Sequence, residues 1–210
     1  MTSISILGSG NMARGIATRA LAGGNSVQIL ARDADKATGL AKELTGQVTT
    51  GRIGDPLSGD IVVLAVPYAA AAPLVAQYGD QLDGKVIVDI TNPVDFTTFD
   101  SLVTPADSSA AEEIAKAAPA GASVVKAFNT TFAGTLVSGQ VAGQPLDVLI
   151  AGDDENAKTA VAGVAEAGGL RPVDAGPLRR ARQLEHAGFL HMTLQQPLGT
   201  GFASALRFPS

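Results

Sequence analysis

A glycine-rich turn lies close to the start of the chain, where residues 3–13 read SISILGSGNMA. The alternating apolar residues before Gly8 predict a short strand, and residues 11–22 predict the helix that follows it. Gly8 can make a tight bend, Gly10 lets backbone N–H groups approach a pyrophosphate, and Ala13 is small enough for the helix to pack on the strand. This G-x-G-x-x-A spacing between a strand and a helix is typical of a dinucleotide-binding unit.

The end of the second predicted strand, residues 26–30, indicates which dinucleotide binds. An NAD-selective protein places a carboxylate at this strand tip to accept hydrogen bonds from the ribose hydroxyls, whereas this chain has Ala31 and Arg32. Arg32 can bind a 2′-phosphate through its planar guanidinium, and Lys36 adds a second positive charge one helical turn later. The alternatives are that both cations are solvated at a helix start and that Asp33 binds the ribose. We expect NADP(H).

Composition excludes several other classes of function. The chain has 210 residues, 46% of them hydrophobic, with a formal net charge of −5. That charge argues against nucleic acid and anionic membrane surfaces as partners. The chain has no cysteine and only two histidines, so we expect neither disulfides nor a metal site. Together these features predict a cytoplasmic enzyme with no membrane-spanning segment.

Strand-like and helix-like segments alternate along the chain, which predicts an α/β fold with a doubly wound, Rossmann-type parallel sheet. We expect a dinucleotide-binding domain over residues 1–133 and a small C-terminal α/β extension over residues 134–210, packed on the first domain or continuous with it. The expected strands after the second are residues 47–50, 61–66, 86–90, 123–128, 146–151 and 170–173. The expected helices after the second are residues 68–78, 108–118, 154–167 and a long terminal helix over 178–195.

Uncharged polar residues gather where the predicted strands end. In a doubly wound sheet, ligands bind beyond the carboxyl ends of the strands, so these ends are expected to form one cleft. The opposite strand ends carry ordinary turn residues. The expected cleft comprises Gly8 to Met12, Ala31-Arg32, Pro67-Tyr68, Thr91-Asn92-Pro93 and Asn129-Thr130-Thr131.

Taken together, the motifs resemble the coenzyme F420-dependent NADP oxidoreductase family. They are GSGNM at residues 8–12, Ala31-Arg32, VPY at 66–68, DITNP at 89–93, KAFNTT at 126–131, AGDD at 151–154 and LRPVDAGPL at 170–178. The resemblance spans most of the chain. One departure is Ala31, where family members often have Ser or Thr before the arginine.

The resemblance implies a homodimer that exchanges hydride between NADP(H) and the deazaflavin F420. It implies that Ser9, Asn11 and Met12 lie on the pyrophosphate side and that Pro67 and Asn92 border the nicotinamide. Arg32 and Lys36 would bind the 2′-phosphate. The full set of expected cofactor-binding residues is Gly8, Ser9, Gly10, Asn11, Met12, Arg32, Lys36, Val66, Pro67, Tyr68, Asn92, Pro93 and Asn129.

The sequence contains no obvious proton donor for ketone reduction. A Tyr-x-x-x-Lys pair is absent, because Ala72 follows Tyr68 by four residues and Leu82 follows Tyr78 by four. Exchange of hydride between two ring cofactors needs mainly stacking, distance and exclusion of water. One alternative is an NADPH-dependent reductase of a small carbonyl, imine, quinone or flavin with His191 or Tyr68 as the catalytic donor. Another is a non-enzymatic module that senses NADPH.

Three further residues carry expectations of their own. Lys126 lies inside a predicted strand and is expected to be a buried lysine in a structural salt bridge. Gly188 interrupts the terminal helix, which costs about 1 kcal/mol relative to alanine, so another backbone is expected to approach it, such as that of a dimer partner. Phe202, in a glycine-containing tail, is expected to stack on a planar ring.

Overall fold

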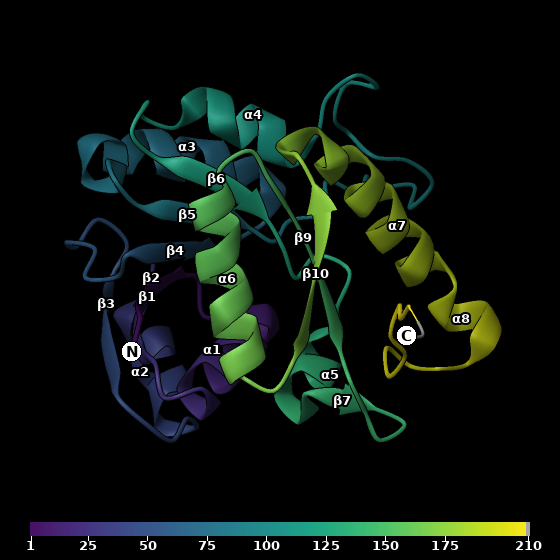
Figure 1. Cartoon of the computed structure of the whole chain (residues 1–210), viewed down its shortest axis with the longest axis horizontal. Helices are drawn as coiled ribbons and strands as arrows, with labels where there is room; N and C mark the ends of the chain where they lie inside the picture. Colours follow the sequence, from purple (N-terminus) through teal and green to yellow (C-terminus); the bar gives the residue numbers. More distant parts are fainter. Residues whose placement is uncertain (209–210) are drawn as a thin grey trace.

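A single eight-stranded sheet runs through the centre of the protein (Figure 1). The computed structural model describes residues 1–208. The strand order is β10-β9-β6-β5-β4-β1-β2-β3, and every neighbouring pair in this sheet is parallel except β6 and β9. The strands are β1 (Ser3–Leu7), β2 (Ser26–Ala31), β3 (Val48–Arg52), β4 (Ile61–Leu64), β5 (Val86–Asp89), β6 (Ser123–Lys126), β9 (Asp147–Gly152) and β10 (Arg171–Gly176).

Helices cover both faces of the sheet. Three of them begin with a capping side chain, namely Asp33, Ser109 and Asp154, each of which accepts a backbone N–H of the first turn. The helices are α1 (Asn11–Ala22), α2 (Ala34–Lys42), α3 (Tyr68–Tyr78), α4 (Ala110–Ala117), α5 (Ala133–Ser138), α6 (Glu155–Ala167), α7 (Ala181–Thr193) and α8 (Gln195–Leu198). Two 3-10 turns, η1 (Gly79–Leu82) and η2 (Leu178–Arg180), and a small hairpin of β7 (Gln140–Val141) and β8 (Gln144–Pro145) complete the chain.

The two largest apolar cores lie on the two faces of the sheet, and a smaller one contains Leu149, Ala151 and Leu184. The first contains buried residues of α1, α2, α5 and α6, such as Ile16 and Val161. The second contains buried residues of α3 and α4, such as Val75 and Ile114. Because the central strands are buried on both faces, β4 is a continuous apolar run, IVVL, with every residue buried.

The doubly wound fold predicted from the sequence is confirmed, with two corrections. β9 pairs antiparallel with β6, through Val125 with Gly152 and Lys126 with Ala151, so the sheet is mostly rather than wholly parallel. The expected terminal helix is divided into η2, α7 and α8, with the break at Leu194. Strands on both sides of the predicted boundary at residue 133 share one sheet, and the boundary itself stays a prediction.

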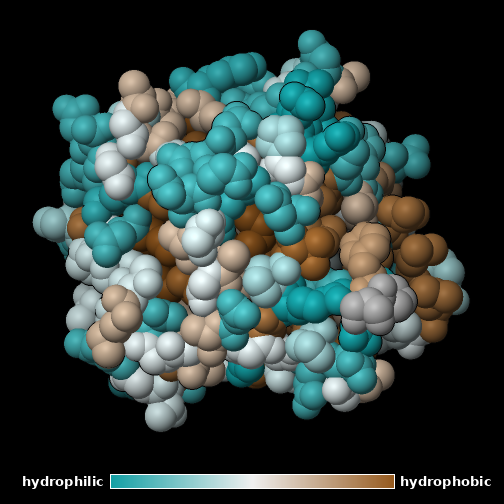
Figure 2. All heavy atoms as spheres, in the orientation of Figure 1, coloured by the Kyte–Doolittle hydropathy of each residue, from teal (hydrophilic) through white to brown (hydrophobic). Residues whose placement is uncertain are grey.

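Hydrophobic side chains gather over α7 and α8 at the right-hand edge of the molecule (Figure 2), where Leu190, Leu194 and Leu198 are exposed. Across residues 1–208, none of the helices combines the length and the apolar character that crossing a bilayer requires.

Candidate active site

Two adjoining cavities lie along the carboxyl edge of the parallel strands. The smaller measures about 380 Å³ and the larger about 460 Å³. They share four lining residues, Gly10, Ala65, Val66 and Pro67, so they meet where β1 and β4 end. This is the edge at which doubly wound sheets bind their ligands.

The turn after β1 lines the smaller cavity and brings backbone close to it. Gly8 has φ +125°, and a Cβ at this position would lie 2.1 Å from the carbonyl oxygen of Ala65, so only glycine fits. Gly10 precedes α1, no side chain caps the helix there, and a Cβ at Gly10 would meet no atom within 4 Å. The first N–H groups of α1 therefore border open space, which suits a phosphate group.

The far end of the smaller cavity is cationic. Arg32 and Lys36 both line it, and within residues 1–208 neither forms an ion pair. Asp33 also lines it, but its Oδ1 accepts the backbone N–H of Asp35 at 3.0 Å and caps α2. The two cations have no carboxylate partner, and the Asp33 carboxylate already accepts a backbone hydrogen bond. This arrangement fits a 2′-phosphate better than an unphosphorylated ribose.

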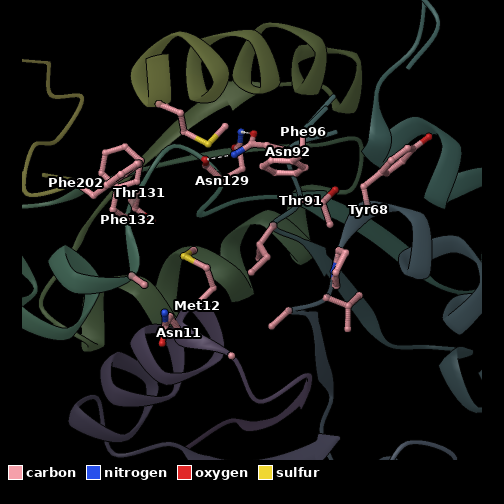
Figure 3. Close-up of a pocket in the computed structure, with 17 residues that line it drawn as sticks. Asn11, Met12, Tyr68, Thr91, Asn92, Phe96, Asn129, Thr131, Phe132 and Phe202 are labelled. Atoms are coloured by element: carbon pink, nitrogen blue, oxygen red, sulfur yellow. Dashed lines mark hydrogen bonds between the residues drawn. The ribbon is translucent and has the colours of Figure 1, made fainter. Parts of the chain in front are cut away.

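The larger cavity is mainly apolar (Figure 3). Its lining includes Phe96, Phe132 and Phe202, together with the thioether side chains of Met12 and Met192. The rings of Phe132 and Phe202 meet edge to face with 5.0 Å between their centroids. Among the described residues, the lining includes no Lys, Arg, His, Asp or Glu. Such a cavity suits a flat, uncharged ring system.

Two asparagines bridge the loops after β5 and β6 at the wall of the larger cavity (Figure 3). Asn92 Nδ2 donates to the backbone oxygen of Asn129 at 2.8 Å, and Asn129 Nδ2 donates to Asn92 Oδ1 at 2.9 Å. Asn129 Nδ2 also donates to the backbone oxygen of Leu184 in α7, at 2.8 Å. Two buried oxygens here, Asn129 Oδ1 and Thr91 Oγ1, have no hydrogen-bond partner within residues 1–208. Buried oxygens without a partner are uncommon and suit a ligand's N–H groups.

The backbone before Asn129 is strained. Phe128 has φ +62°, a conformation that bulky residues rarely adopt. Thr131 holds this turn closed, because its backbone N–H and its hydroxyl both donate to the Phe128 oxygen, at 3.1 and 2.7 Å. Strain of this kind persists where the surrounding structure enforces it, and it concentrates at functional sites.

A buried ion cluster lies behind the asparagines. Lys126 is fully buried, and its Nζ lies 2.7 Å from both Asp89 Oδ2 and Glu185 Oε1. It also donates to the backbone oxygen of Thr91 at 2.6 Å. Burial raises the pKa of Glu185, against the opposing effect of Lys126. The expectation that Lys126 is a structural lysine in a salt bridge is confirmed.

The two expected proton donors differ in position. Tyr68 begins α3 and lines the larger cavity, and its pKa is raised by burial and by Glu113, Glu185 and Asp89. His191 lines neither cavity. It is 4% exposed, its ring lies 4.3 Å from that of Phe132, and its Nε2 forms a hydrogen bond with Ser204 Oγ at 2.8 Å. Burial lowers the pKa of His191, so this histidine is neutral at pH 7.

Nearly all the expected cofactor-binding residues line one of the two cavities. The exception is Pro93, which is buried beside the larger cavity and lines neither. Sequence reasoning did not place Phe96, Phe132 or Met192 at the site. A usable signal existed for the phenylalanines, because each follows a polar strand-end motif within a few residues. Phe202 lines the larger cavity, as the expected stacking requires.

The expected close approach to Gly188 is confirmed, but the approaching atoms belong to the same chain. A Cβ at Gly188 would lie 2.8 Å from Asn92 Oδ1 and 3.0 Å from the backbone oxygen of Asn129. The suggestion that a dimer partner explains this glycine was therefore wrong.

The chain is similar in sequence and structure to several known proteins. A family model described as "NADP oxidoreductase coenzyme F420-dependent" matches residues 3–93. The F420-dependent NADP reductase of Methanothermobacter thermautotrophicus is 34% identical over 193 residues, which cover 85% of this chain and 82% of the relative. A crystal structure of a candidate F420-dependent NADP reductase from Arthrobacter sp. FB24 matches with a TM-score of 0.87 and 28% identity, covering 100% of both chains.

One relative is much longer. Metalloreductase STEAP3 of Rattus norvegicus is 36% identical over 182 residues, which cover 87% of this chain and 35% of that protein, so the chain spans about a third of its length. The methanogen relative, by contrast, is matched over most of both chains. The resemblance predicted from the motifs is thereby confirmed, and the chain belongs to the family of coenzyme F420-dependent NADP oxidoreductases.

Proposed function

We propose that this protein transfers hydride between NADP(H) and F420. The 2′-phosphate end and pyrophosphate of NADP(H) would lie in the smaller cavity and along the glycine turn, and its nicotinamide would lie beside F420 in the larger cavity. The observation that carries the proposal is the junction of a cationic cavity with an uncharged aromatic one at Gly10, Ala65, Val66 and Pro67. An NADP(H) molecule that crosses this junction would bring its nicotinamide beside a second ring in the larger cavity, and such proximity is the main requirement of hydride transfer.

Selection of NADP(H) is attributed to Arg32 and Lys36. Within residues 1–208 neither side chain pairs with a carboxylate, so both are available to a ligand, whereas Asp33 caps α2. The pyrophosphate would lie against Ser9, Gly10, and the first N–H groups of α1. NADPH supplies the hydride itself when bound, and the protein's part is to hold both rings and exclude water.

The nicotinamide half is assigned to Met12, Pro67, Asn92 and Asn129, which line the larger cavity. The unpartnered Asn129 Oδ1 and Thr91 Oγ1 suit hydrogen bonds from a carboxamide. The aromatic side chains beyond them, Phe96, Phe132 and Phe202, would contact the deazaflavin ring.

No protein group is assigned as a general acid. His191 is neutral and lies behind Phe132, and Tyr68 is the single ionisable side chain that lines the larger cavity among the described residues. A carbonyl or imine reductase would use Tyr68 as its donor, so the Tyr68→Phe variant separates that second candidate from the main proposal.

Stopped-flow absorbance tests the proposal. Purified protein is mixed with NADPH or NADH and with oxidised F420, a riboflavin-type flavin, or no acceptor. The expected result is rapid loss of deazaflavin absorbance with NADPH, at a rate that exceeds that with NADH by about tenfold or more, since one charged hydrogen-bonded contact is worth that much. Tight NADPH binding without reduction of any acceptor contradicts the proposal and favours an NADPH sensor.

We further propose a homodimer. The exposed apolar side chains along α7 and α8, Leu190, Leu194 and Leu198, and Phe99, which packs on Phe189 of α7, support it, because a subunit contact would cover them. Sedimentation equilibrium gives the oligomeric state directly. The cytoplasmic location stays a prediction from the sequence.

A further inference from the structure

We infer that Gly188 is a positioning residue of the active site: it allows α7 to pack directly on the Asn92–Asn129 bridge and thereby fixes the two loops that form one wall of the larger cavity. The inference rests on the proposed function for its kinetic readout. The geometry that supports it is independent of any ligand.

The bridge connects three segments that are distant in sequence. Asn92 follows β5, Asn129 follows β6, and Leu184, whose oxygen accepts from Asn129 Nδ2, lies in α7. Leu184 and Gly188 are four residues apart in the same helix, so they lie one above the other on one helix face. That face is the one that meets both asparagines.

Gly188 leaves no space for a side chain at this contact. A Cβ would lie 2.8 Å from Asn92 Oδ1, 3.0 Å from the Asn129 backbone oxygen and 3.1 Å from Asn129 Nδ2. All three atoms take part in the hydrogen bonds of the bridge. A methyl group at residue 188 therefore either displaces α7 or breaks the bridge.

The helix has no reason of its own to carry glycine here. Gly188 is in the interior of α7 and is buried, and alanine is the better helix former at such a position. The backbone conformation does not require glycine either, because Gly188 is absent from the positive-φ residues of the described chain. The contact with the two asparagines is thus the property that only glycine provides.

The bridge matters for hydride transfer because Asn92 and Asn129 both line the larger cavity. Displacement of their loops changes the distance and angle between the two rings, and a shift of about 1 Å can cost about 100-fold in rate. The 2′-phosphate end of the site lies in the other cavity, with Arg32 and Lys36. Affinity for NADPH is therefore expected to change much less than kcat.

The test compares Gly188→Ala with Gly163→Ala. Gly163 lies within α6, and a Cβ there would meet no atom within 4 Å, so it is a matched glycine-to-alanine change without a contact. Gly188→Ala is expected to lower kcat with F420 by about 10- to 100-fold while the Kd for NADPH changes by less than about threefold. Gly163→Ala is expected to keep both values.

A double-mutant cycle with Asn92→Ala shows whether Gly188 acts through the bridge. Once Asn92 is truncated, the alanine at 188 no longer meets Oδ1, so the second substitution is expected to reduce kcat much less than it does in the wild-type background. The inference would be overturned if the two substitutions lowered kcat independently, so that their fold-losses multiplied in the double variant. A wild-type kcat in Gly188→Ala would also overturn it.

The inference can still be tested if Gly188→Ala does not fold or if the wild-type protein does not reduce F420. If Gly188→Ala fails to fold, Asn92→Ala alone tests the bridge, and an unchanged kcat would overturn the inference. A wild-type protein that binds NADPH but reduces no F420 contradicts the proposed function instead. In that case, NMR shifts of the Asn92 and Asn129 side-chain amides in folded Gly188→Ala, compared with Gly163→Ala, still decide whether residue 188 holds the bridge.

Discussion

Lys126 and Glu185 form a buried ion pair, with 2.7 Å between Nζ and Oε1, and connect strand β6 to helix α7. Glu185 Oε2 also accepts the backbone N–H of Ala110 at the start of α4, at 3.0 Å. Asp89 completes the cluster from β5. One lysine therefore holds together strands β5 and β6 and helix α7, on which the asparagine bridge packs.

This arrangement predicts unequal costs for removing its members. Lys126→Met leaves two buried carboxylates without a cation and is expected to destabilise the protein by about 3–5 kcal/mol. Glu185→Gln leaves Lys126 bound to Asp89 and Thr91, so the expected cost is about 1–3 kcal/mol. Urea unfolding measures both. Equal losses of unfolding free energy in the two variants would show that Lys126 is not the centre of the cluster.

Arg32 is predicted to determine the choice between NADPH and NADH. Arg32→Ala removes charged hydrogen bonds worth about 1.5–3 kcal/mol, so the Kd for NADPH should rise by about 10- to 150-fold. The Kd for NADH should not change, because NADH has no 2′-phosphate. Isothermal titration with both nucleotides measures this, and Arg179→Ala, an exposed arginine that lines neither cavity, is the control. Parallel losses for both nucleotides would contradict the assignment.

Tyr68 is predicted to be dispensable for hydride transfer. Burial, with Glu113, Glu185 and Asp89, raises its pKa above the ordinary value of 10.0, so it remains protonated through the neutral range. Tyr68→Phe should keep kcat within about threefold, whereas loss of a true general acid costs about 100- to 10,000-fold. His191→Gln should behave in the same way. A large loss in either variant, with a changed pH profile of kcat, would favour a carbonyl or imine reductase.

Asp147 is predicted to contribute to stability in a pH-dependent way. Burial alone would raise the pKa of Asp147, but Arg171 and the backbone N–H of Phe208 outweigh it and hold the pKa below the ordinary value of 3.8. A lowered carboxyl pKa stabilises the folded state above that value, and the contribution is lost as the pH falls through the folded pKa.

Asp147→Asn should therefore be less stable than the wild type by about 1–3 kcal/mol at pH 7, the cost of a buried charged hydrogen-bonded group. The gap should narrow as the pH falls below 3.8. Urea unfolding across this range measures the gap, and one that stays constant with pH would contradict the role of the charge.

The residues that the sequence predicts for the nucleotide half of the site line the smaller cavity, and they could be found because their determinants are local. Gly8, Gly10 and Arg32 lie within or just after the first two strands, and the turn geometry follows from their residue types alone. The parallel core strands were also predictable from short apolar runs such as residues 61–64.

The other half depends on contacts between distant segments. The fit of Gly188 against Asn92 and Asn129 depends on how α7 docks, which no local pattern encodes. The antiparallel pairing of β9 with β6 is likewise a contact between segments distant in sequence, which no local pattern encodes.

The most direct test of the proposed reaction follows the transferred hydrogen. NADPH carrying deuterium at the reactive nicotinamide carbon is mixed with F420 and the protein in ordinary water, and the reduced deazaflavin is analysed by mass spectrometry. Direct transfer between two rings that meet in the larger cavity predicts that the deuterium is found on the deazaflavin. The experiment is run with each of the two NADPH stereoisomers that carry deuterium at this carbon. The account would be contradicted if neither isomer passed its deuterium to the deazaflavin, or if no deazaflavin were reduced.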